Sequence, residues 1–269
     1  MKFQVFHNMA CLFGVLMGLQ FIPSGAAADL NEGELAYDRG DYELAYSIWL
    51  PLARNGNPTA QYNLATLYRF GQGIESNTII AMEWYSRAAS QGHVLSQVNL
   101  GRLYLSGLGL AGDPYKALIW FQLAAEQGNA FGEFYLGVQY LQGSGVKVDL
   151  DLARGLLLSA ANQGVREAAY ELGQIYRDGI GLDSNEFEAV RWFQIGARAG
   201  HPGSQKIMGS LYEQGIVVEE DMARAYFWYS LASANGVSKA VTCRSRVMSQ
   251  LSPAELNHLN EIIDQWRRR

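Results

Sequence analysis

The chain has 269 residues, of which 49% are hydrophobic and 17% are charged, and its formal net charge is −5. This balance excludes a disordered chain, and the absence of a basic run before Arg267–Arg269 argues against a nucleic-acid binder. Two cysteines are too few for a disulfide scaffold. The 29 glycines among 269 residues are more than the usual share of about 7% of a chain.

Residues 1–28 have the pattern of a secretory signal peptide. Lys2 is followed by an apolar stretch from about Leu12 to Ile22 and then by small residues up to Ala28. The alternative, a membrane anchor, needs about 20 apolar residues, which is more than this stretch provides. We therefore expect cleavage before Asp29, a periplasmic or secreted chain, and no stable membrane insertion after cleavage.

Residues 29–56 are predicted to form a shortened repeat. Residues 37–42 bridge two short helices, and Ala45, Trp49 and Gly56 stand in phase with the copies that follow.

Residues 57–236 repeat with a period of 36 residues, which indicates five stacked units, 57–92, 93–128, 129–164, 165–200 and 201–236. The columns that define the period contain glycine (Gly56, Gly92, Gly128, Gly164, Gly200, Gly236), tyrosine (Tyr68, Tyr104, Tyr140, Tyr176, Tyr212) and alanine (Ala45, Ala81, Ala117, Ala153, Ala189, Ala225).

Each unit is predicted to contain two amphipathic helices. The second helix starts at a capping Asn or Asp, and the Gly56 column ends it in a left-handed conformation. A turn with two glycines joins the helices; the fifth unit has Val217 at the second position, so we expect its turn to differ slightly. The capping residues are Asn77, Asp113, Asp149, Asn185 and Asp221.

A further glycine column lies inside the first helices, where glycine costs up to about 1 kcal/mol relative to alanine. We expect these glycines to let a neighbouring helix approach closely, with Trp and Tyr from adjacent columns filling the space. They are Gly101, Gly137, Gly173 and Gly209.

Residues 237–269 are predicted to be capping helices, as solenoids require at their ends. The second of them begins with Ser252, Pro253 and Glu255, a typical helix start. It ends in three arginines, whose charges suit a helix C-terminus.

The repeat resembles the 36-residue Sel1-like repeat, a relative of the tetratricopeptide repeat. The motif is carried in the second unit by Ser96, Leu100, Gly101, Tyr104, Gly107, Gly109, Asp113, Ala117, Trp120, Phe121, Ala124, Ala125 and Gly128. The resemblance implies an all-α fold, an α/α solenoid with a right-handed superhelix, and an exported bacterial member of the family. It also implies a partner bound by the first helices on the concave side.

The sequence predicts no catalytic, cofactor-binding or metal site. The Gly107–Gly112 string matches a dinucleotide motif but lacks the preceding strand. His93 and His201 share one repeat column, so we interpret them as turn residues rather than metal ligands. Similar proteins linked to β-lactams have a cysteine pair in each repeat, whereas Cys243 lies outside the repeats and is interpreted as structural.

We therefore predict a non-enzymatic exported adaptor for a protein or peptide partner, active in cell-envelope signalling or assembly. The alternative is a hydrolase or binding protein for cell-wall or β-lactam compounds. Some of the candidate partner-binding residues could instead pack against adjacent helices. These candidates are Tyr62, Arg69, Phe70, Val98, Arg102, Leu105, Phe131, Phe134, Leu141, Tyr170 and Arg177.

Overall fold

The computed structural model describes residues 29–108 and 111–268, so the predicted signal peptide lies outside the described residues. This part of the chain contains 14 helices and no strand. The helices are α1 (Leu30–Asp38), α2 (Tyr42–Arg54), α3 (Pro58–Phe70), α4 (Thr78–Ser90), α5 (Val94–Ser106), α6 (Pro114–Glu126), α7 (Ala130–Gln142), α8 (Leu150–Asn162), α9 (Arg166–Asp178), α10 (Glu186–Arg198), α11 (Pro202–Gln214), α12 (Met222–Ala234), α13 (Ser238–Met248) and α14 (Pro253–Arg267).

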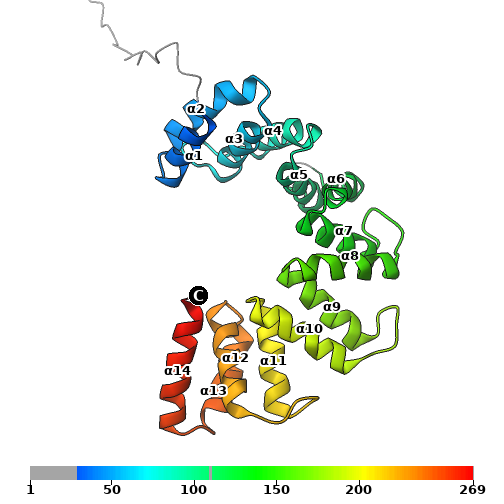
Figure 1. Cartoon of the computed structure of the whole chain (residues 1–269), viewed down its shortest axis with the longest axis vertical. Helices are drawn as coiled ribbons and strands as arrows, with labels where there is room; N and C mark the ends of the chain where they lie inside the picture. The colour runs from blue at the N-terminus through cyan, green and yellow to red at the C-terminus, as the bar shows by residue number, and fades with distance from the viewer. Residues whose placement is uncertain (1–28, 109–110, 269) are drawn as a thin grey trace, which may run out of the picture.

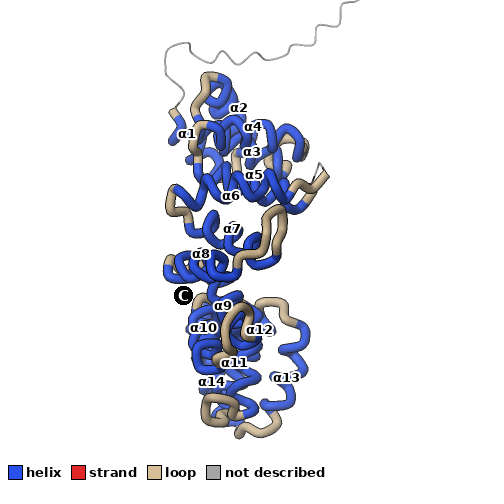
Figure 2. Tube along the Cα trace, turned by 90° about the vertical axis from the view of Figure 1, so that its right-hand side faces the viewer, coloured by secondary structure: helices blue, strands red, loops and turns tan. Residues whose placement is uncertain are grey.

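The helices stack in chain order along an arc, with α1 and α2 at one end and α12, α13 and α14 at the other (Figure 1). From α1 to α13 each helix packs mainly on its neighbours in the chain, whereas α14 packs on α12 rather than on α13. Seen from the side, the same stack is elongated, with helices joined by loops (Figure 2). The prediction of an all-α solenoid is confirmed.

The second helices begin and end as predicted. Each N-cap side chain accepts a hydrogen bond from the backbone N–H three residues later, as in the 3.0 Å bond from Ile80 N–H to Asn77 Oδ1. The same bond occurs at Asp113, Asp149, Asn185 and Asp221. Each glycine of the Gly56 column follows its helix with a positive φ, between +73° and +94°.

The turn between the two helices keeps the same backbone conformation in the fifth unit. Gly71 and Gly73 both have φ of +68°, whereas Gly215 and Val217 have φ of +65° and +64°. The prediction that this turn differs is therefore wrong. The cause is geometric, because the turn must connect two helices that pack as they do in the other repeats.

Of the four glycines inside the first helices, Gly101, Gly173 and Gly209 face an aromatic ring and Gly137 faces Leu157. None of these side chains comes from the columns we predicted. A Cβ at Gly101 would lie 2.6 Å from the Phe121 ring, and one at Gly209 would lie 2.6 Å from Tyr229. The packing column is thus Tyr85, Phe121, Leu157, Phe193 and Tyr229, one position after the tryptophans. The tryptophans are offset by one residue, which turns their side chains by about 100° around the helix.

Buried glutamines link successive units. Gln61, which is 4% exposed, donates through Nε2 to the Ala53 carbonyl of the preceding unit (3.0 Å) and accepts from Gln91 Nε2 (2.8 Å). Gln97 and Gln205 make the equivalent bonds in the second and fifth repeats. We call these bonds the amide links.

An ion pair attaches the C-terminal cap to the last repeat. Glu213 of α11 accepts hydrogen bonds from Arg246 Nε (2.6 Å) and Nη2 (2.8 Å) of α13, and from the Tyr229 hydroxyl (2.7 Å) of α12. The Arg246 guanidinium lowers the pKa of Glu213 below its ordinary value. Three helices therefore meet at one carboxylate.

Candidate partner-binding face

The first helices of repeats one to four carry exposed apolar and cationic side chains, which we call the first-helix face. Phe70 is 61% exposed and Phe131 is 50% exposed, and Leu105 is also exposed. Arg102 of α5 and Arg177 of α9 are exposed as well. Exposed apolar side chains are typical of contact sites where they form a contiguous patch.

Other predicted face residues are half-buried. Tyr62 lies 4.9 Å from the His93 ring and Tyr170 lies 4.4 Å from the His201 ring, so each contacts the start of the next repeat. Phe134 packs against the apolar core cluster formed by the third and fourth repeats. These three side chains contribute to packing between repeats as well as to the surface. The predicted residues that are half-buried are Tyr62, Arg69, Phe134, Leu141 and Tyr170.

Val98 is 7% exposed, so its prediction as a surface residue is wrong. It occupies the column in which the neighbouring repeats have Tyr62, Phe134 and Tyr170. Because the valine side chain is much shorter, it ends below the surface that the larger rings reach. The column predicts the direction of a side chain but not its depth.

The arginines of the face contact neighbouring side chains. Arg69 Nη1 donates to Asn99 Oδ1 of the next repeat at 3.0 Å. The Arg102 guanidinium lies 5.7 Å from the centre of the Tyr135 ring, also in the next repeat. Arg177 instead pairs with Asp178 at 2.7 Å, and this carboxylate raises the pKa of Arg177 and neutralises its charge locally. Arg69 and Arg102 therefore keep a positive charge that no carboxylate among the described residues neutralises, whereas the charge of Arg177 is paired.

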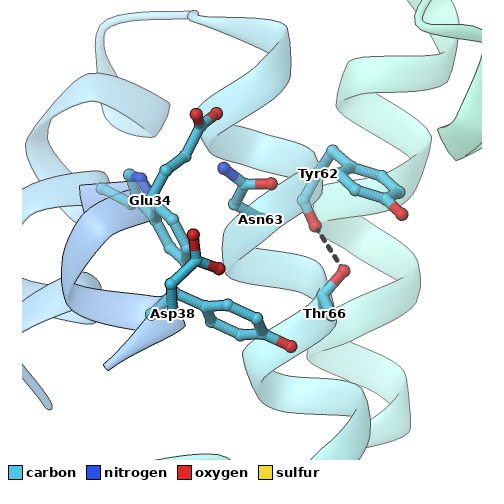
Figure 3. A pocket seen from close by; sticks show the side chains of 7 residues that line it. Glu34, Asp38, Tyr62, Asn63 and Thr66 are labelled. Atoms are coloured by element: carbon cyan, nitrogen blue, oxygen red, sulfur yellow. Dashed lines mark hydrogen bonds between the residues drawn. The ribbon is translucent and has the colours of Figure 1, made fainter. Parts of the chain in front are cut away.

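A cavity of about 300 Å³ lies at the N-terminal end of the face, between α1 and α3. Glu34 and Asp38 of α1 and Asn63 of α3 turn their polar ends toward the same space (Figure 3). Tyr37, Trp49, Tyr62 and Thr66 complete the lining. The cavity gives the face an acidic end next to the aromatic and cationic part.

Sequence reasoning missed the α1 part of this cavity because α1 does not follow the 36-residue period. Gly33 packs on Trp49 just as Gly101 packs on Phe121. Gly33 therefore occupies in α1 the position that Ala65 occupies in α3, although the two residues are 32 rather than 36 positions apart. The shortened turn removes four residues. Aligning the glycine and its aromatic partner, rather than the period, would have placed Glu34 and Asp38 on the face.

The residues considered for metal or cofactor chemistry have structural positions. His93 and His201 are N-caps, and the Nδ1 atom of each accepts a backbone hydrogen bond, from Ser96 (3.3 Å) and Ser204 (3.1 Å). Gly107 ends α5 with φ of +66°. Cys243 is half-buried in α13. Within residues 29–108 and 111–268 no three His, Cys, Asp or Glu side chains are grouped as metal ligands.

The architecture is that of a helical repeat protein whose units are helix–turn–helix pairs. The Sel1 repeat family matches five consecutive segments, 58–93, 94–129, 130–165, 166–201 and 202–237, each one residue later than the predicted units. The chain therefore belongs to the Sel1 repeat family. Sel1 repeats form protein-interaction scaffolds, and proteins of this family are generally non-catalytic.

Several solved structures are similar to the chain. A Sel1 repeat protein from Oxalobacter formigenes is 28% identical with a TM-score of 0.77, and the match covers 88% of this chain and 99% of that one. A protective antigen from uropathogenic Escherichia coli is 25% identical with a TM-score of 0.56, covering 90% of this chain and 61% of that one. An immunity protein from Pseudomonas aeruginosa, 19% identical over 78% and 87% of the two chains (TM-score 0.53), shares the fold alone. No curated protein matches the chain.

Among the described helices, none is both long and apolar enough to cross a membrane.

Proposed function

We propose that the chain is an exported adaptor that binds a protein or peptide partner through the first-helix face, in cell-envelope signalling or assembly. The supporting observation is the exposure of Phe70 and Phe131 on helices whose opposite sides form the core. Aromatic and arginine side chains contribute most of the binding energy at protein interfaces. The Sel1 repeat provides the rigid support that such a face requires.

Export is proposed from residues 1–28, and the protective antigen similar to this chain is consistent with it. N-terminal sequencing of the protein recovered from the periplasm or the medium should give Asp29 as the first residue. Recovery of the chain only from the cytoplasm, with Met1 retained, would contradict export.

The partner should be captured by cross-linking the mature chain in an envelope extract, and its affinity then measured by calorimetry with the purified partner. We expect Phe70→Ser with Phe131→Ser to weaken binding about a thousandfold, since hot-spot residues contribute at least ~2 kcal/mol each and every 1.4 kcal/mol is tenfold. Phe134 is unsuitable for this test because it also packs in the core.

Phe187→Ser is the matched control. Phe187 is 76% exposed but lies on α10, a second helix. Phe187→Ser should leave both the affinity for the partner and the melting temperature unchanged. Equal binding by the wild-type chain and the double variant would refute the proposed face. Hydrolysis of a chromogenic β-lactam by the purified chain would instead favour the hydrolase alternative.

A further inference from the structure

The C-terminal helix shows how a helix binds the outer side of a repeat in this fold. α14 packs on α12 (Figure 1). The Trp266 ring of α14 lies perpendicular to the Phe227 ring of α12, with 5.7 Å between the ring centres. Leu231, one turn further along α12, is 2% exposed and lines the same pocket as Trp266. α14 therefore covers Phe227 and Leu231, and we call these two positions of a second helix the outer pair.

The outer pair faces away from the core of its own repeat. Two residues correspond to about 200° around a helix, so Phe227 lies opposite the buried Ala225 and Tyr229. Among the six second helices from α2 to α12, two large apolar residues form the outer pair in α6 and α12 alone. The pairs are Ser47 and Pro51 in α2, Glu83 and Arg87 in α4, Ile119 and Leu123 in α6, Gly155 and Ser159 in α8, Arg191 and Ile195 in α10, and Phe227 and Leu231 in α12.

The outer pair of α6 is exposed. Ile119 is 41% exposed and Leu123 is 38% exposed, whereas the equivalent Leu231 is buried under α14. α6 packs on α5 and α7 and lies on the outer side of the arc (Figure 1). On the next second helix, a Cβ at Gly155 would have no atom within 4 Å, so space remains beside the pair. Within the part of the chain that the structure describes, no helix takes the place on α6 that α14 takes on α12.

We infer that the outer pair of α6 binds an amphipathic helix of a partner protein, as the outer pair of α12 binds α14. The occupant is a helix because a helix covers the same two positions elsewhere in this chain. Removal of Ile119 and Leu123 from water provides the driving force. Both residues lie on a second helix, so this binding is separate from the proposed first-helix face and does not depend on it.

α14 indicates which sequence the partner helix needs. Its large apolar side chains recur every three or four residues and pack in the core cluster at the C-terminal end; they are Leu256, Leu259, Ile263 and Trp266. One polar contact cannot be repeated on α6. The Tyr226 hydroxyl donates to Asn260 Oδ1 at 3.0 Å, but the residue of α6 equivalent to Tyr226 is Leu118. The partner helix should therefore have an apolar residue in place of Asn260.

The test uses the purified mature chain, in which α14 itself occupies the outer pair of α12. The probe is a fluorescein-labelled peptide with the sequence of residues 252–267 and the change Asn260→Leu. We expect fluorescence anisotropy to show saturable binding of one peptide per chain, and weaker binding of the peptide that keeps Asn260. A free peptide of this length is largely unfolded, so the circular dichroism of the mixture should show more helix than the two components alone.

The double variant Ile119→Glu with Leu123→Arg places the outer pair of α4 on α6. It should weaken peptide binding at least about tenfold, because two buried apolar contacts are lost. A Glu and an Arg four residues apart favour a helix, so the circular dichroism and Tm of the chain should not change. Ile195→Ser is the matched control. Ile195 is exposed at the position of Leu123 but on α10, so its replacement should leave peptide affinity unchanged.

Four outcomes would overturn the inference. The first is the absence of saturable binding up to the solubility limit of the peptide. The second is an unchanged affinity in the double variant, or an equal loss in Ile195→Ser, which would place the peptide elsewhere on the chain. The third is tighter binding of the peptide that keeps Asn260. The fourth is a dimer of the peptide-free chain that the double variant abolishes in sedimentation, since a second copy would then cover the pair.

Discussion

Val217 holds a backbone conformation that glycine adopts in the other repeats. Its φ of +64° lies in the left-handed region, and among the described residues it is the one non-glycine residue with a positive φ. Left-handed backbone costs a residue with a side chain about 1–2 kcal/mol, and a β-branched residue is especially unsuited to it. The strain is therefore local to a single residue in the turn of the fifth repeat.

We predict that Val217→Gly stabilises the chain by about 0.5–1 kcal/mol, because relief of strain exceeds the entropy that glycine loses on folding. Urea denaturation followed by circular dichroism measures the change. Val218→Gly is the control: Val218 packs against the core and has no positive φ, so its replacement should destabilise. A loss of stability in both variants would show that Val217 is unstrained.

The two histidine N-caps make stability depend on pH. Burial lowers the pKa of His93 and of His201, and near His201 the charge of Glu167 raises the pKa while that of Arg166 lowers it. Because both folded-state values lie below the unfolded value of about 6.5, the unfolded chain takes up protons first as the pH falls. The stability is therefore complete above this unfolded pKa and is lost as the pH drops toward the folded values.

We predict that the double variant His93→Asn and His201→Asn loses less stability than the wild type between pH 7.5 and 5.5. Asn57 and Asn129 are N-caps in the same column, so asparagine fits and accepts at both pH values. A lost N-cap costs about 1 kcal/mol, or about 2–4 °C in Tm for a chain of this size. Equal shifts in Tm for both proteins would exclude the histidines as the cause.

At the scale of single helices, the glycines inside the first helices set how closely helices pack. A Cβ at Gly101 would meet the Phe121 ring at 2.6 Å, whereas a Cβ at Gly155, inside α8, would have no atom within 4 Å. We predict that Gly101→Ala destabilises by about 1–3 kcal/mol. Gly155→Ala should stabilise by up to about 1 kcal/mol, since alanine is the better helix former. Thermal and urea unfolding measure both; stabilisation by Gly101→Ala would refute close packing there.

The helices themselves could be predicted because their signals are local. A capping Asn or Asp, the apolar spacing and a glycine after the last turn lie within one unit, and all three recur in phase. The burial of Val98 and the packing partner of Gly101 could not be predicted in this way. Both depend on the side chain that the neighbouring helix presents. The repeat period does not predict how deeply a side chain is buried.

The candidate site was predicted only in part for the same physical reason. Phe70 and Phe131 are exposed as expected, whereas Glu34 and Asp38 were missed because the short turn after α1 shifts the register by four residues.

At the scale of the whole molecule, packing between chain neighbours makes the repeats exchangeable units. Removing residues 94–129 would join His93 to Ala130, so that one N-cap replaces another. It would place Ala88 of α4 where Ala124 of α6 packs closely on Gly132. The contact between Ala88 and Gly132 in the shortened chain would therefore reproduce the contact between Ala124 and Gly132.

We predict that deletion of residues 94–129 leaves a cooperatively folded chain with the same helicity per residue. Deletion of residues 94–111, half a repeat, should abolish cooperative melting because it leaves a second helix without its partner. Circular dichroism and calorimetry compare the two. Loss of cooperativity in both deletions would show that the repeats are not interchangeable.

The amide links are incomplete in the third and fourth repeats, where Glu133 and Ala169 replace the buried glutamine and cannot donate to the carbonyl of the preceding unit. The third repeat retains a bond from Gln163 to Glu133 (2.8 Å), but the fourth has Ala169 and Ala199 at the two positions, neither of which can form the bond. A solenoid behaves mechanically as a spring, and its stiffness is limited by its most compliant coil. When a load or a bound partner pulls the two ends of the arc apart or together, the fourth repeat is where we expect the bending to concentrate.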